Sequence, residues 1–262
     1  MNDGKKEPIW NHLQELASRL KVIVIAIVIV MIIVAFLPAS LFPFDSNYHN
    51  QNSSENPMYE TLLSYILKKI ESDLLPENAQ IMAQSWTSLI ETYFLLSLAI
   101  AIIICFPLII YEIYKFISPA LYENERKIAI HFIFISSVLF LFGMILSYTL
   151  ILPITFKILM IFVYTTGALP LISLDNFIFL VVAVTLGTGF VFTSPLILYF
   201  LIKAGIVNKE TIKRRRKYFY AAIIIIVMIL TPDPTLISDI IILFPLIILL
   251  EISLYIAGKT KK

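Results

Sequence analysis

The distribution of apolar residues along the chain predicts a protein that crosses a membrane several times. Four apolar runs approach or exceed the roughly 20 residues that span the hydrocarbon of a bilayer. They comprise residues 22–37, 88–111, 128–152 and 177–202. Two shorter runs follow, at residues 218–230 and 236–256, separated by a strong turn signal at residues 231–234. This shorter pair either crosses a locally thinned bilayer or forms a shallow re-entrant hairpin.

Helical spacing of apolar residues also predicts two amphipathic segments outside these runs. In residues 1–21, apolar side chains recur every three or four positions, which predicts an interfacial helix lying on the membrane before the first span. Residues 45–89 form the first outer loop, and a second such pattern there predicts a cap helix that ends at Leu75 and Pro76. Pro153 is expected to begin a second outer loop that extends to Asn176.

Composition agrees with a membrane protein and excludes several other classes. Of the 262 residues, 59% are hydrophobic and 15% are charged, whereas a soluble domain is roughly half apolar and about a quarter charged. The net charge of +2 is too small to indicate a nucleic-acid partner. The single cysteine, Cys105, lies within an apolar run, which excludes a disulfide framework and a cysteine-based metal site.

The positions of lysine and arginine predict the orientation of the chain. Seventeen of these 20 residues fall at the two chain ends or in residues 112–127 and 203–217, whereas Lys68, Lys69 and Lys157 fall on the other side. Cytoplasmic segments are enriched in Lys and Arg. Both termini, including the tail at residues 258–262, are therefore expected in the cytoplasm. The span count is then even, and we expect six helices in one transmembrane domain comprising residues 1–262.

The spans carry little that resembles a catalytic or cofactor site. The sequence contains no Gly-rich phosphate loop and no His/Glu metal cluster, so we expect neither a cofactor nor a metal ion. Glu91 and Glu112, near the two ends of the second span, are interpreted as ordinary interface residues. His131, Ser136 and Ser137 are the nearest candidates for an intramembrane enzyme, and their spacing does not indicate a nucleophile–base pair.

Acidic residues on the basic side of the chain are the remaining anomaly. Glu15 precedes the first span, and Glu123 and Glu125 lie in the short segment after the second. A pair of carboxylates suits the planar fork of a guanidinium group, so these residues could form a site for an arginine-bearing peptide. Alternatively, they pair with neighbouring cations of the chain, Arg19, Arg126 and Lys127, and have no binding role. The residues alone leave both interpretations open.

Four segments resemble the TatC family, the core subunit of the twin-arginine protein translocase. They are His12-Leu13-Gln14-Glu15-Leu16, the segment from Phe116 to Tyr122 with Glu125-Arg126, Gly143-Met144, and Leu230-Thr231-Pro232-Asp233. The resemblance covers essentially the whole chain in order. It implies an all-α polytopic membrane protein, a cup-shaped bundle of six helices with short fifth and sixth helices. The family's cytoplasmic face receives the twin-arginine signal peptides of folded precursor proteins.

The motif match also implies roles for individual residues. Glu15 and Glu125 would bind the arginines of the signal peptide. Eight further residues would complete or shape this site: His12, Leu16, Arg19, Phe116, Pro119, Leu121, Tyr122 and Arg126. Contacts with partners are expected at Thr193, Pro195, Thr231 and Asp233.

The same resemblance implies partners, location and energy source. Single-span TatA-type proteins would meet the concave side, and whether a TatB-type partner also exists stays open. The family works in the plasma membrane as a homo-oligomeric receptor complex, without enzymatic activity, and the proton-motive force drives transport. A small-solute or ion transporter that uses kinked spans two and four is the alternative.

The sequence departs from the family pattern in three places. Ala17 stands where the family has an arginine two residues after the N-terminal glutamate, although Arg19 is kept. Thr193 stands where a glutamate is frequent in the fourth span. The turn reads Thr231-Pro232-Asp233-Pro234 instead of Thr-Pro-Pro-Asp. The second departure puts a membrane-buried carboxylate contact with the TatA-type partner in doubt.

Overall fold

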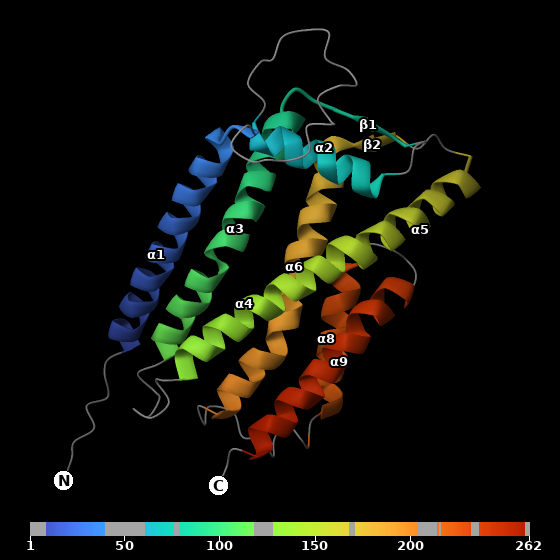
Figure 1. The fold of residues 1–262 in the computed structure, drawn as a ribbon. Helices are drawn as coiled ribbons and strands as arrows, with labels where there is room; N and C mark the ends of the chain where they lie inside the picture. Colours follow the sequence, from blue (N-terminus) through green and yellow to red (C-terminus); the bar gives the residue numbers. More distant parts are fainter. Residues whose placement is uncertain are drawn as a thin grey trace, which may run out of the picture.

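The computed structural model of the chain is a bundle of long helices (Figure 1). The residues that it describes are 9–39, 61–75, 79–117, 128–167, 171–203, 214, 216–231 and 236–259. The long helices are α1 (Ile9–Phe36), α3 (Ser88–Ile117), α4 (Ile128–Leu146), α5 (Leu152–Thr165), α6 (Leu174–Lys203), α8 (Arg216–Leu230) and α9 (Leu236–Lys259). The expectation of an all-α polytopic protein is confirmed.

Within the described ranges, five helical stretches are long and apolar enough to cross a membrane. They are Gln14–Phe36, Ser88–Phe116, His131–Thr165, Leu174–Ile202 and Ile237–Ile256. Helix α8 has 15 residues, which corresponds to a rise of ~22 Å against ~30 Å of hydrocarbon. It packs against α9 (Figure 1). Six crossings are compatible with this arrangement if the bilayer thins around α8 and α9.

The bundle has two ends that differ in what they carry (Figure 1). The end at which α1, α4 and α8 begin and α3, α6 and α9 finish is called the terminal end here. The opposite end, called the cap end, carries the short helix α2 (Leu62–Leu74) and two short strands, β1 (Gln80–Met82) and β2 (Leu171–Ser173). The strands pair in parallel, with Gln80 opposite Leu171.

Two helices extend further than the hydrophobic pattern predicts. Helix α1 runs without interruption from Ile9 to Phe36, so the expectation of a separate interfacial helix is wrong for its residues up to 21. No proline or glycine lies within α1 to break it. Helix α4 continues through a π-helical turn, η5 (Ser147–Ile151), into α5, so the outer loop expected from Pro153 is also wrong. Pro153 lies in the first turn of α5, where a proline is tolerated.

The predicted cap helix is confirmed as α2. The Thr61 side chain caps its first turn by accepting a hydrogen bond from the Ser64 backbone amide (3.3 Å). Leu63, Ile70 and Leu74 are buried on its inner face, as the spacing predicts. The Tyr148 hydroxyl of η5 donates a hydrogen bond to the Asp73 carboxylate (2.9 Å), which ties α2 to the α4–α5 connection.

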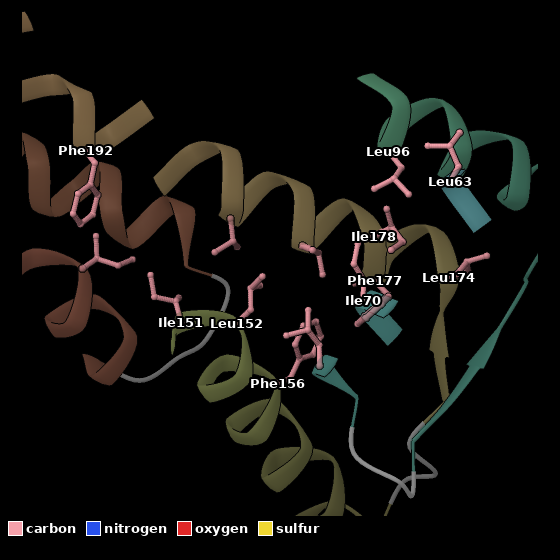
Figure 2. Close-up of a cluster of buried hydrophobic side chains, with 14 of the residues drawn as sticks. Leu63, Ile70, Leu96, Ile151, Leu152, Phe156, Leu174, Phe177, Ile178 and Phe192 are labelled. Atoms are coloured by element: carbon pink, nitrogen blue, oxygen red, sulfur yellow. The ribbon is translucent and has the colours of Figure 1, made fainter. Parts of the chain in front are cut away.

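Two clusters of buried side chains hold the long helices together. Toward the cap end, Figure 2 shows Leu63, Ile151, Phe177 and Ile178 converging from α2, η5 and α6. Toward the terminal end, Phe106 of α3 stacks on Phe140 of α4, with ring centroids 3.7 Å apart. The contacts toward the terminal end fix α3, α4 and α6 relative to one another, and α1 packs along α3. The candidate site depends on these helix ends.

Candidate functional site

Three charged side chains meet at the terminal end, where α1 packs along α3 (Figure 1). One guanidinium nitrogen of Arg19 (Nη2) lies 2.9 Å from Oε1 of Glu15, one turn earlier in the same helix. The other (Nη1) lies 3.1 Å from Oε2 of Glu112 on α3. Each contact is a hydrogen bond as well as an ion pair. One guanidinium therefore bridges a carboxylate of its own helix and a second, Glu112, that lies 93 residues from Arg19 in the sequence.

Partial burial makes these contacts more costly to break than ordinary surface pairs. The exposed fractions of the side chains are 19% for Arg19, 31% for Glu15 and 10% for Glu112. Exposed ion pairs contribute ~0–1 kcal/mol. A pair that is partly shielded from water costs more to break, because the remaining charge loses its partner in a position where water solvates it poorly. The cluster carries one positive and two negative groups, so its net charge is negative.

The local sequence explains how the cluster forms. Glu15 and Arg19 are four residues apart in a helix, a spacing that places an acid and a base on the same face. Glu112 lies in the last turns of α3, beyond Pro107 and on the antiparallel neighbour of α1. Tyr114, two residues after Glu112 in α3, is also buried and packs against Phe200. The packing that holds the end of α3 also holds Glu112 beside α1.

The other residues of the predicted peptide site are placed only in part. His12 lies in the first turns of α1, Leu16 is 45% exposed, and Phe116 lies in the last turn of α3. All three are at the terminal end with Glu15 and Arg19. The remaining candidates, Pro119, Leu121, Tyr122, Glu125 and Arg126, lie outside the described residues. The helix ends that flank them, Ile117 and Ile128, are both at the terminal end (Figure 1).

The comparison that decides the family is a match to a family model. The model described as "Sec-independent protein translocase protein (TatC)" matches residues 11–245, which run from Asn11 in α1 into the first half of α9. The chain belongs to the TatC family. It is therefore a component of a protein translocase, the twin-arginine system that the family serves.

Relatives from distant bacteria support this assignment. The "Sec-independent protein translocase protein TatC" of Aquifex aeolicus (strain VF5) is 31% identical over 253 residues, which covers 96% of this chain and 95% of that protein. The corresponding protein of Campylobacter jejuni is 28% identical over 262 residues, covering 97% and 94%. A solved structure, "Crystal Structure of Twin Arginine Translocase Receptor- TatC", is 28% identical and matches with a TM-score of 0.73. It covers 96% of this chain and 100% of the solved chain.

The residues predicted to contact partners of this TatC chain lie in two places. On α6, Thr193 is 2% exposed and its hydroxyl donates to the Phe190 carbonyl (2.7 Å), and Pro195 is also buried. At the end of α8, Thr231 donates to the buried Asp239 carboxylate of α9 (2.6 Å). Asp233 lies outside the described residues. Contact of these residues with a partner stays a prediction.

Two ion-pairing acids of the terminal end were not among the sequence candidates. Glu112 is interpreted from the sequence as an interface residue, yet its side chain is only 10% exposed and is paired with Arg19. Glu251 of α9 pairs with Arg216 (3.3 Å) and accepts a hydrogen bond from Tyr220, which fastens α8 to α9. The signal that the sequence offers for Glu112 is its position. It is an acid at the end of the second span that lies on the same side as Arg19 of the first span.

Proposed function

We propose that this TatC chain is the receptor core of a twin-arginine translocase, which binds the twin-arginine signal peptides of folded precursor proteins at the terminal end. The observation that carries the proposal is the 2.9 Å contact between the Glu15 carboxylate and the Arg19 guanidinium. It supports the proposal because the group expected from the peptide is also a guanidinium. A carboxylate that holds one guanidinium in this position is suited to hold another.

The chemistry of the surroundings favours a specific peptide over a general polycation. Basic residues are numerous in the segments assigned to this side, among them Arg214, Arg216 and Lys217. They repel loosely bound cations, whereas partly buried carboxylates attract a guanidinium that makes close hydrogen bonds. A lysine offers a compact charge without the planar fork, so it gains less at the same carboxylate.

We assign the second arginine of the peptide to Glu125, following the motif match. Phe116, Pro119, Leu121 and Tyr122 shape the segment around Glu125, and His12, Leu16 and Arg126 border the two acids. Support comes from the helix ends that flank this segment. Helix α3 finishes at Ile117, five residues after Glu112, and α4 begins at Ile128, three residues after Glu125.

The proposal includes an orientation and a set of partners. The terminal end faces the cytoplasm and the protein lies in the plasma membrane, in keeping with the excess of Lys and Arg on that side. TatA-type single-span proteins bind the concave side, and Thr193, Pro195, Thr231 and Asp233 are the assigned contacts. The protein acts without catalysing a reaction, as a homo-oligomer, and the proton-motive force drives export.

Site-specific photo-cross-linking tests the proposed peptide site. A photoreactive residue at position 16, one residue from Glu15, is expected to capture a synthetic peptide carrying two adjacent arginines and an apolar stretch. Replacing both arginines of the peptide by lysine is expected to reduce capture by about tenfold, the effect of losing one charge-assisted hydrogen bond.

The matched control places the same photoreactive residue at position 28. Val28 is 41% exposed, similar to Leu16 at 45%, but lies about three turns deeper in α1. Only background capture is expected there. Equal capture of the arginine peptide at both positions would show that the peptide does not bind specifically at the terminal end. Equal capture of the arginine and lysine peptides at position 16 would contradict the proposed site in the same way.

A further inference from the structure

The carboxylate assigned to the peptide already has a guanidinium partner within the chain. Arg19 donates to Glu15 through Nη2 and to Glu112 through Nη1, at 2.9 Å and 3.1 Å. Its side chain is 19% exposed, and its Nε has no hydrogen-bond partner among the described residues. A peptide arginine that binds Glu15 must therefore replace a contact that this protein makes with its own arginine.

We propose that Arg19 is an internal substitute for the signal-peptide arginine, and that Glu112 is a positioning residue that retains Arg19 during the exchange. This inference rests on the proposed function, because it presupposes that the peptide binds Glu15. Only one contact changes in this exchange. The hydrogen bond from Arg19 Nη2 to Glu15 is broken and the peptide guanidinium binds Glu15 instead, while Arg19 Nη1 remains bound to Glu112.

Glu112 keeps this exchange from leaving a charge without a partner. If Arg19 had Glu15 alone, peptide binding would strand a guanidinium that is four-fifths shielded from solvent. With Glu112 at 3.1 Å, Arg19 keeps an ion pair throughout. Glu112 is itself only 10% exposed, so the pair that remains is shielded from water and weakly screened by salt.

The charge of the cluster fits the arrival of one guanidinium. Glu15, Glu112 and Arg19 together carry one excess negative charge. One peptide arginine makes the group neutral, whereas a second would make it positive. The second arginine therefore needs an acid outside this cluster. Each arginine of the pair then has its own carboxylate.

The internal arginine lowers the apparent affinity of every ligand that binds Glu15. Each ligand must displace a guanidinium that is already hydrogen-bonded in a partly desolvated position. This cost is common to arginine and lysine peptides, because both replace the same contact. The preference for arginine therefore comes from its planar fork at the Glu15 carboxylate, which lysine lacks.

Peptide-binding measurements on four forms of the full chain in nanodiscs test the inference. They are the wild type, Arg19→Gln, Glu112→Gln and the double variant, each titrated with the arginine peptide and its lysine counterpart. Arg19→Gln removes the competitor and is expected to raise affinity for the arginine peptide about threefold or more. The lysine peptide is expected to gain by the same factor, because the displaced contact with Arg19 is common to both ligands.

Glu112→Gln is expected to act in the opposite direction. Without its second anchor, Arg19 holds Glu15 more firmly, and affinity for the arginine peptide falls several-fold. The double variant is expected to bind at least as well as the wild type, because no competitor remains. A purely structural role for the ion pairs would instead make all three variants bind more weakly.

Two additions keep the outcome interpretable. Arg19→Lys retains the charge and lacks the planar fork, so its affinity for the arginine peptide is expected to lie between those of the wild type and Arg19→Gln. It replaces Arg19→Gln in the test if that variant does not fold. Glu15→Gln separates the two proposals. If it leaves arginine-peptide affinity unchanged, the proposed function is wrong. If it weakens binding while neither Arg19 variant strengthens it, the internal-competitor inference alone is wrong.

Discussion

Charge reversal at the peptide site, Glu15→Lys, is expected to abolish measurable binding of a twin-arginine peptide. Loss of a charge-assisted hydrogen bond costs roughly 1.5–3 kcal/mol, which corresponds to about 10- to 150-fold in affinity. The introduced ammonium then repels the peptide guanidinium in a position that is only partly exposed. Because the wild-type cluster has one excess negative charge, reversal makes it positive. Titration of a labelled peptide against the protein in nanodiscs measures the effect.

The control for this prediction adds charge without removing the carboxylate. Gln14 is exposed and adjacent to Glu15, so Gln14→Lys introduces an ammonium in the same turn of α1. It is expected to weaken binding less than threefold, because a solvated charge is screened over about 8 Å at physiological ionic strength. If Gln14→Lys and Glu15→Lys weaken binding equally, the effect is one of general surface charge, and Glu15 has no specific role.

Much of the fold follows from the hydrophobic pattern. Backbone polar groups in lipid must bond within the segment, so an apolar run of sufficient length has little choice but to be helical. The predicted second and fourth spans accordingly correspond to α3 and α6. The cap helix followed from the spacing of its apolar residues, and its buried Leu63 and Ile70 lie where that spacing places them.

The helix ends were less predictable because the residues there are compatible with two structures. Pro153 is found both where helices stop and in the first turn of a helix. The sequence does not reveal the π-helical turn of η5, which lets α4 continue into α5. Similarly, Lys21 at the edge of an apolar run fits the end of an interfacial helix as well as the interior of α1.

The candidate site was predictable in its motif residues and not in its pairing. Glu15 stands in a recognisable segment, and its relation to Arg19 follows from their four-residue spacing. Glu112 gave no such signal, because a single acid near a helix end ordinarily reaches the headgroups. Only the packing of α3 along α1 shows that it meets Arg19 instead. Pairing between distant segments depends on tertiary structure, which periodicity does not encode.

The close approach of α4 and α6 leads to the largest expected effect on stability. A Cβ atom at Gly143 would lie 2.9 Å from Cβ of Phe192 and 3.0 Å from the Thr188 carbonyl oxygen. Phe192 is fully buried, and Figure 2 shows its side chain within the core cluster. Small residues permit such contacts between membrane helices. Gly143→Val is therefore expected to destabilise the folded protein by about 1–3 kcal/mol or more, the usual cost of overpacking.

Thermal unfolding in detergent, followed by loss of monodisperse protein, measures this destabilisation. Val138→Phe also adds volume on α4, at a position that is 47% exposed, and it is expected to leave the unfolding temperature nearly unchanged. Because the nearest atom to the new side chain is the Cβ of Phe192, truncation by Phe192→Ala removes none of the closest contact and leaves a cavity. The double variant should therefore be less stable than Gly143→Val alone. Recovery of stability in the double variant would show instead that the phenylalanine ring, and not the backbone spacing of α4 and α6, limits the size of residue 143.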